Sequence, residues 1–144
     1  MEVRQIPWGG MEYAKMIALR NELLCLPVGG CVFGADLRAE KDYYSFLAYD
    51  DAGEAVGTLL LMPESETQVH VRQVATLPRV RGQGYGHALM AAAEAFAREK
   101  GFVRMVLDSR QGAKHFYAAC GFADCGEDFG RPDLRLTPME KHIG

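Results

Sequence analysis

Three glycines at alternate positions, Gly82, Gly84 and Gly86, separate a β-branched run from a long alanine-rich run. The β-branched run ends at Pro78 and is typical of a strand, whereas the alanine-rich run has apolar residues on a helical period and ends at Gly101. A glycine-rich turn between a strand and a helix offers backbone N–H groups and the positive end of the helix dipole. The pattern therefore predicts a site for a phosphate or a similar anion, although such a turn can also simply connect two elements.

Two familiar nucleotide-binding patterns do not fit this turn. The P-loop needs a Lys-Ser/Thr pair after its last glycine, and His87 stands there instead. The dinucleotide pattern G-x-G-x-x-G fails from Gly82, whose third position is His87, and from Gly84, whose third position is Leu89. Asp108 lies roughly where that pattern has its ribose-binding acid, but 144 residues are few for a full doubly wound domain.

The pattern that fits is Arg81-x-x-Gly84-x-Gly86, which resembles the Q/R-x-x-G-x-G/A signature of the GNAT superfamily of N-acetyltransferases. Residues 116–122, Phe-Tyr-Ala-Ala-Cys-Gly-Phe, look like the F-Y-x-x-x-G-F segment at the last helix of that family. The two segments have the family's order and separation. The resemblance implies an enzyme that transfers the acetyl group of acetyl-CoA, its cosubstrate, to a primary amine of a small molecule or peptide by direct attack on the thioester.

The same resemblance implies roles for individual residues. Tyr117 matches the tyrosine that protonates the leaving thiolate of coenzyme A, although a tyrosine beside Phe116 can equally be a packing residue. Arg110 stands where family members often carry an asparagine bonded to the pantetheine arm, so it either reaches the ligand's phosphates or is exposed. The residues expected to bind the cofactor, many of them through backbone groups, are Val74, Ala75, Thr76, Arg81, Gly82, Gln83, Gly84, Tyr85, Gly86, His87, Arg110 and Phe116.

The sequence points to a general base less specifically than it points to Tyr117 as the acid. His70 precedes the glycine turn by a spacing resembling that of the catalytic glutamate in histone-modifying members, and a neutral imidazole suits amine deprotonation near neutral pH. Strand parity puts His70 on the same side as Arg72 and Val74. Three alternatives stay open: a half-exposed strand histidine without a catalytic role, Glu40 or Asp42 acting through a water, and no single base.

The elements that would position these residues follow the order β-α-α-β-β-β-α-β-α-β-β, which matches the GNAT fold. We expect an α/β (α+β) domain over residues 1–144, with a mixed, twisted central sheet of about six to seven strands and helices on both faces. The resemblance implies that the central strand and the strand after the long helix splay apart around the pantetheine arm. The expected strands are 3–6, 45–49, 55–62, 104–107, 123–127 and 134–140, with a central strand that starts at residue 68 and ends at the proline at position 78. The expected helices are 12–24, 35–41, 87–100 and 111–120. Residues 27–30 are expected to break the first helix.

Charge and composition limit the kinds of partner and cofactor that we expect for this protein. The formal net charge is −3 with acids and bases interspersed, which argues against a nucleic-acid partner. No apolar run approaches the ~20 residues of a membrane span, and the first residues lack a signal-peptide core, so we expect a cytoplasmic protein without a membrane partner. The four cysteines form no C-x-x-C pair, and His115, Cys120 and Cys125 match no zinc spacing. We therefore expect buried, reduced thiols and no metal.

The acceptor amine is not encoded in a recognisable motif. The acidic residues of the C-terminal segment would attract a cationic amine or form a solvated loop, and Tyr43 and Tyr44 would line the acceptor pocket or pack. A non-catalytic acyl-CoA-binding module, acting as a sensor or in an assembly, is the alternative to an enzyme. A third hypothesis is a protein that binds a pyrophosphate-containing ligand other than acetyl-CoA. The sequence also leaves open whether the protein forms a homodimer through its closing strands. The acidic residues are Asp124, Glu127, Asp128 and Asp133.

Overall fold

The structure is a computed structural model that describes residues 1–25 and 37–144. The expected helix break at residues 27–30, Cys31 and the first two residues of the expected second helix lie outside the described residues. Backbone hydrogen bonds join eight described strands in the order β1-β2-β3-β4-β5-β8-β6, with β7 paired to β8. The strands are β1 (Glu2–Ile6), β2 (Tyr44–Tyr49), β3 (Ala55–Pro63), β4 (Gln68–Thr76), β5 (Arg104–Arg110), β6 (Ala123–Asp124), β7 (Phe129–Arg131) and β8 (Leu134–His142).

The helices complete a mixed α/β fold, as the sequence predicted. The α-helices are α1 (Met11–Arg20), α2 (Tyr85–Glu99) and α3 (Lys114–Ala119), and a π-helical turn, Asn21–Cys25, extends α1. Short 3-10 turns occupy Leu37–Asp42, Pro78–Val80 and Gln111–Ala113. Within residues 1–25 and 37–144, the helices are too short or too polar to cross a membrane.

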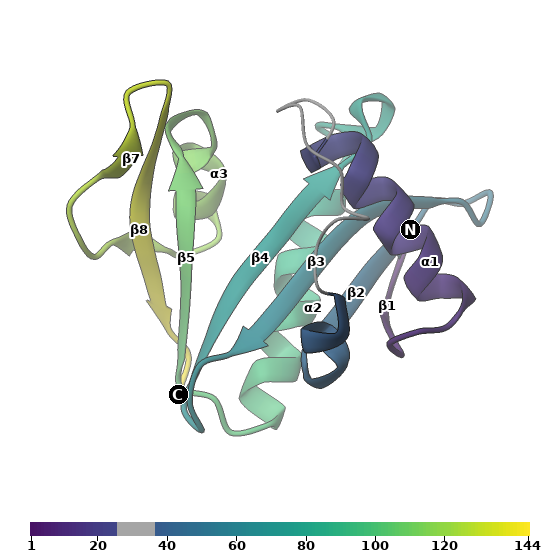
Figure 1. The fold of residues 1–144 in the computed structure, drawn as a ribbon, viewed down its shortest axis with the longest axis horizontal. Coiled ribbons are helices and arrows are strands. Elements are labelled where there is room, and N and C mark those ends of the chain that lie inside the picture. Colours follow the sequence, from purple (N-terminus) through teal and green to yellow (C-terminus); the bar gives the residue numbers. More distant parts are fainter. Residues whose placement is uncertain (26–36) are drawn as a thin grey trace. The chain divides into compact units, whose positions relative to one another are not determined.

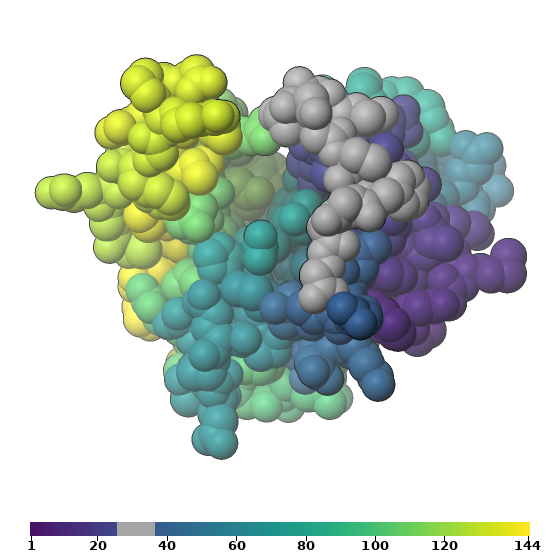
Figure 2. All heavy atoms as spheres, in the orientation of Figure 1, coloured from purple at the N-terminus to yellow at the C-terminus, as the bar shows by residue number. Residues whose placement is uncertain are grey.

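Three predicted elements differ from the structure. The described part of the second helix is a 3-10 turn, and the strand expected over residues 123–127 contains only two residues of β6. The segment 128–133, which lies between the last two expected strands and has no predicted element, contains β7, which pairs with β8 from Phe129↔Leu136 to Arg131↔Leu134. Three residues between aspartate and proline are too few to show a period-two pattern, so the sequence did not reveal this strand. The residues of β7 are exposed, and the hairpin of β7 and β8 appears yellow-green to yellow in Figure 2.

The described residues form two compact units. The N-terminal unit contains Met1–Met62 and Arg72–Ala93, and the C-terminal unit contains Pro63–Val71 and Glu94–Gly144. Both β4 and α2 run from one unit into the other. The glycine turn and residues 74–76 therefore belong to the N-terminal unit, whereas His70, Arg110, Phe116 and Tyr117 belong to the C-terminal unit.

In the N-terminal unit, helices cover both faces of the sheet (Figure 1). On one face, α1 buries Met16 and Ile17 against Leu47 and Leu60 of β2 and β3. On the other face, α2 lies close to β3 because Gly57 has no side chain. A Cβ added there would lie 3.0 Å from Leu89 Cδ1 and 3.2 Å from Thr76 Cγ2. The remaining members of the α1-side core are Ile6, Tyr13, Leu19 and Tyr49.

In the C-terminal unit, strand alternation separates an apolar face from a polar face. Met105, Leu107 and Ser109 of β5 are buried, whereas the residues between them are half-buried or exposed. The parallel ladder between β4 and β5 joins three positions, from Gln68↔Arg104 to His70↔Val106, while β4 runs on to Thr76 and β5 to Arg110. Paired residues point to the same side of the sheet, and so do residues two apart on one strand. His70 pairs with Val106, and Asp108 lies two residues after Val106, so His70 and Asp108 share a face.

A buried ion pair fastens the Leu37–Asp42 turn to α1. The guanidinium of Arg20 donates to both carboxylate oxygens of Glu40, at 2.7 and 2.9 Å, and the Tyr13 hydroxyl donates to Glu40 Oε1 at 2.8 Å. Burial raises the pKa of Glu40, but the hydrogen bonds and charge of Arg20 outweigh it, so the pKa lies below the ordinary 4.5. Since its oxygens are engaged in this way, Glu40 serves the packing of this turn.

Replacing Glu40 by Gln should lower the free energy of unfolding at neutral pH by about 3 kcal/mol, because Arg20 would stay buried without a counter-charge. The lowered pKa of Glu40 means that the ion pair stabilises the fold above about pH 4.5 and loses this effect as the pH falls through the folded-state value. The variant should therefore also lose part of its acid dependence. Urea unfolding at neutral and acid pH measures both effects. An equal loss in the exposed control Glu22→Gln would contradict this account.

Candidate active site

The glycine turn opens α2 with two residues in the left-handed region of backbone conformation. Gly82 has φ 79° and Gly84 has φ 91°, and a Cβ at Gly82 would meet nothing within 4 Å. The backbone conformation, and not close packing, therefore favours glycine at these two positions. The first described α2 bond runs from the Ala88 N–H to the Gly84 carbonyl at 3.0 Å. Helix geometry leaves the N–H groups of the first turn without acceptors inside the helix, so this end of α2 suits an anion.

Neighbouring side chains fix the turn without covering it. Arg79 binds Asp50 Oδ2 at 3.0 Å and Glu54 Oε2 at 2.9 Å, which ties the start of the turn to the β2–β3 connection. Tyr85 is buried and anchors the first turn of α2, whereas Arg81 is exposed. The predicted phosphate site is thus an exposed backbone surface with a guanidinium nearby in sequence.

The backbone of β4 is irregular immediately before the residues expected to hold the acetyl and pantetheine amides. Gln73 has φ 57°, the one described residue other than glycine with a positive φ. Such a conformation costs on the order of 1 kcal/mol or more and needs support. The buried Thr58 supplies it, because its hydroxyl donates to the Gln73 carbonyl at 2.7 Å. Val74, Ala75 and Thr76, the residues expected to bind through backbone groups, follow directly after this left-handed residue.

Tyr117 lies in an aromatic environment on α3. Its ring packs edge-on against Phe116, with centroids 5.1 Å apart, and against Phe122 at 6.3 Å. The pKa of Tyr117 is raised to about 12, chiefly by burial and to a lesser extent by the nearby Cys120, while the charge of Arg110 opposes the rise. The phenol therefore keeps its proton across the neutral range, where it can act as a proton donor but not as a base.

Arg110 ends β5 and is exposed. Its positive charge acts to lower the pKa of Tyr117, because a cation favours the phenolate form. Arg110, at the position where the resemblance leads us to expect an asparagine, thus has Tyr117 as a neighbour in the C-terminal unit.

His70 lies between two carboxylates on the polar face of the C-terminal unit. Its Nδ1 is 3.3 Å from Glu64 Oε2, and its Nε2 is 3.4 Å from Asp108 Oδ2. The imidazole side chain is 19% exposed, so it is neither open to bulk solvent nor sealed from it. A histidine with carboxylates at both nitrogens can exchange protons with a substrate while its ring is held in place.

The other acid–base candidates are engaged elsewhere or exposed. Glu40 is bound to Arg20 and Tyr13, as described above, and Asp42 is exposed at the end of its 3-10 turn. Tyr43 packs against the α1-side core, so packing accounts for this tyrosine.

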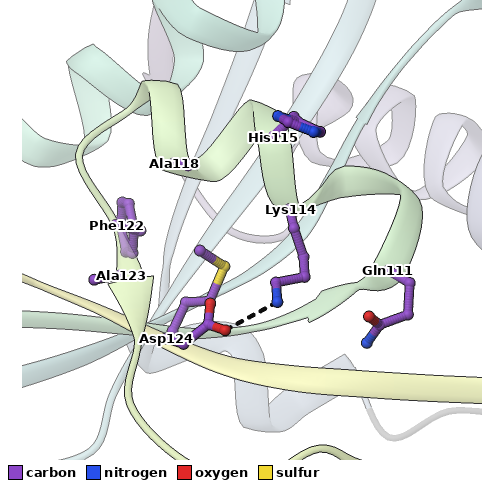
Figure 3. A pocket seen from close by; sticks show the side chains of 8 residues that line it. Gln111, Lys114, His115, Ala118, Phe122, Ala123 and Asp124 are labelled. Carbon is purple, nitrogen blue, oxygen red and sulfur yellow. Dashed lines mark hydrogen bonds and ion pairs between the residues drawn. The ribbon is translucent and has the colours of Figure 1, made fainter.

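A pocket of about 470 Å³ lies between α3, β6 and β8 in the C-terminal unit (Figure 3). At its rim Lys114 binds Asp124 at 2.9 Å, and its apolar surface includes Phe122 and Met139. Two further acidic residues of this region also have local partners, because Asp128 accepts a hydrogen bond from Thr137 and Asp133 lies 3.5 Å from Arg131. Local pairing therefore accounts for most of the acidic cluster.

The cysteines lie in different environments. Cys25 and Cys120 are half-buried, but Cys125 is exposed, which corrects the expectation that the thiols are all buried. Burial raises the pKa of the Cys120 and Cys125 thiols, which disfavours their thiolates. Among residues 1–25 and 37–144, no group of three or more His, Cys, Asp or Glu side chains is arranged to hold a metal ion.

Sequence reasoning missed the residues that surround the predicted ones. Glu64 and Asp108 were not connected with His70, because the connection depends on the β4–β5 register and on the bend before β4. Strand alternation was the available signal for Asp108, but it needs the register to be known. The left-handed Gln73 and its partner Thr58 carry no local sequence signal at all.

Comparisons with known proteins agree with this fold. Residues 16–122 match the model of the Acetyltransferase (GNAT) family. N-acetyltransferase 8 of Rattus norvegicus is 30% identical over 92 residues, an alignment that covers 58% of this chain and 41% of that protein. The chain thus spans about two fifths of the length of this curated relative.

Two solved structures share the fold over nearly their whole length. A protein from Lactobacillus plantarum named as an N-acetyltransferase superposes with a TM-score of 0.86 at 22% identity, covering 99% of both chains. An aminoglycoside 6'-N-acetyltransferase complexed with coenzyme A superposes with a TM-score of 0.83 at 13% identity, covering 99% of this chain and 97% of that one. These likenesses show the fold, and the family model spans most of the chain, including the glycine turn and Tyr117. The chain therefore belongs to the Acetyltransferase (GNAT) family.

Proposed function

We propose that this chain is a cytoplasmic, acetyl-CoA-dependent N-acetyltransferase that acts on a primary amine of a small molecule or peptide. The observation that carries the proposal is the left-handed glycine turn at the start of α2, immediately after the irregular end of β4. We take residues 1–144 as one acetyltransferase domain, without a nucleic-acid or membrane partner. A homodimer through the closing strands remains part of the proposal.

The cofactor would be held mainly by backbone groups. The N–H groups of Gly82 and of residues 84–87 would bind the pyrophosphate, because those of Arg81 and Gln83 already donate to carbonyls within the turn. The α2 dipole and the Arg81 side chain would add positive charge. The amide groups of Val74 to Thr76 would bind the pantetheine arm and polarise the acetyl carbonyl, a contribution of about 3 kcal/mol where one such donor has been removed. Arg110 and Phe116 are the further residues that we propose to bind this ligand. Coenzyme A in the related aminoglycoside acetyltransferase supports this ligand.

Transfer then needs four proton movements and one exchange of bonds. An ammonium acceptor gives a proton to His70, and the neutral amine attacks the thioester carbon, so that a C–N bond forms and the C–S bond breaks. The leaving sulfur takes a proton from Tyr117, and the second nitrogen proton restores the phenol through water. The first proton leaves His70 for solvent, so one proton is released for each acetyl group transferred.

Burial limits what Tyr117 can do in this sequence. A phenol with a pKa of about 12 is a weaker acid than a thiol of pKa ~8.5, so complete transfer to a free thiolate is uphill by roughly 5 kcal/mol. Tyr117 would therefore act chiefly as a hydrogen-bond donor to the sulfur as negative charge develops. This weak acidity is also the observation that favours the alternative, an acyl-CoA-binding module without turnover.

Replacing Gly84 by Ala should raise the Kd for acetyl-CoA about tenfold, because a side chain at φ 91° is strained and would redirect the N–H groups of the turn. Gly53→Ala is a matched control: it has φ 84°, a Cβ there meets nothing within 4 Å, and it lies in the β2–β3 turn. Calorimetric titration measures both affinities. A similar loss of affinity in the two variants would assign the effect to general destabilisation and contradict the site.

Replacing Tyr117 by Phe should lower kcat by about tenfold or more and leave the Kd for acetyl-CoA nearly unchanged, because the hydroxyl acts on the leaving sulfur. Since the pKa of Tyr117 is about 12, wild-type activity should show no alkaline loss from this group in the neutral range. Thiol release with a panel of primary amines measures kcat. Unchanged turnover in the variant would exclude the donor role, and absence of turnover in the wild type with intact binding would favour the binding module.

A further inference from the structure

The two carboxylates beside His70 compete for one proton. A neutral imidazole carries a single N–H, so it can donate to Glu64 from Nδ1 or to Asp108 from Nε2, but not to both. The nitrogen that lacks the proton is the one that can accept a proton from a substrate. The competition between these carboxylates therefore decides which atom of His70 can act as the base.

Glu64 is the better-fixed competitor. Its Oε1 accepts a hydrogen bond from Gln68 Nε2 at 2.8 Å, and Gln68 Oε1 in turn accepts one from Arg104 at 2.5 Å. Arg104 is itself held by Glu140 Oε2 at 2.8 Å. A line of side chains from β8 through β5 to the start of β4 thus sets the orientation of the Glu64 carboxylate. Burial raises the pKa of Glu64, but hydrogen bonds from Gln68 and His70 outweigh it and keep the carboxylate ionised at neutral pH.

Asp108 is held less firmly. Its side chain is 35% exposed, close to the 33% of Glu64, so the two carboxylates differ in their contacts and not in their exposure. The contact of Asp108 with His70 Nε2, at 3.4 Å, is an ion pair. None of the hydrogen bonds between the described side chains fixes its carboxylate. Asp108 is therefore suited to stabilise a positive charge beside Nε2 and is poorly suited to orient the ring.

We propose that Glu64 is a positioning residue that holds the Nδ1–H of His70, so that Nε2 is the proton-accepting atom and Asp108 stabilises the imidazolium formed there. The inference rests on the proposed function, in which His70 takes a proton from the acceptor. The proton moves from the substrate ammonium to Nε2, and the nitrogen keeps the electron pair that attacks the thioester. An exposed carboxylate next to Nε2 favours acceptors that arrive as cations, so the substrate class is a primary ammonium.

The first test reads the tautomer of His70 directly. In ring ¹H–¹⁵N correlation spectra of the neutral imidazole, recorded on the whole protein, the wild type should show the Nδ1–H form. Glu64→Gln should shift the ring toward the Nε2–H form, because Asp108 then becomes the stronger acceptor. Glu66→Gln is the matched control: it removes the same charge from an exposed position in the same connection. An Nε2–H wild type, or an unchanged tautomer in Glu64→Gln, would overturn the proposal.

The second test separates positioning from binding. Glu64→Gln should lower kcat about tenfold with an amine substrate while the Kd for acetyl-CoA stays unchanged, and Glu66→Gln should leave both at the wild-type values. Asp108→Asn should retain the Nδ1–H tautomer but raise the KM for a cationic amine more than for a neutral amine. If the tautomer shifts and kcat does not, His70 is not the base and the inference fails while the acetyltransferase activity stands. Absence of activity in every form would count against the proposed function, and the tautomer spectra would still decide the role of Glu64.

Discussion

The parallel register between β4 and β5 determines which side chains the C-terminal unit can offer for chemistry. Three paired positions turn Val69, Met105 and Leu107 inward, and the same register turns His70 and Asp108 to the opposite face. A shift of one residue would exchange the two faces, burying the polar groups and exposing the core. The burial of these apolar side chains therefore holds the acid–base groups in position, although none of them takes part in the chemistry.

In the proposed reaction, backbone groups bind the cofactor and side chains move the protons. The glycine turn and residues 74–76 bind through N–H and C=O groups, which need only the right backbone conformation and place little demand on residue type. The chemistry needs particular side chains, and the fold constrains each of them. Burial keeps Tyr117 protonated but makes it a poor acid, while Glu64 is proposed to hold the Nδ1–H of His70 and so to set its tautomer.

The sequence was sufficient to predict the order of the elements, and its motifs were sufficient to propose a candidate site. Gly84 and Gly86 could be recognised because their spacing is local, and so could the aromatic pair at residues 116–117. What could not be predicted depends on contacts between distant residues. The approach of Glu64 to His70 follows from the bend before β4, the support of Gln73 by Thr58 crosses two strands, and β7 is too short to show alternation.

The most direct test of the central claim is a calorimetric titration of the purified protein with acetyl-CoA, with NAD and ATP as comparison ligands. The account predicts micromolar binding of acetyl-CoA, in the range usual for enzyme substrates, and much weaker binding of the other two. Such a result would establish the glycine turn as a coenzyme A site. Failure to bind acetyl-CoA, or a preference for NAD, would contradict the assignment of the turn and with it the proposed reaction.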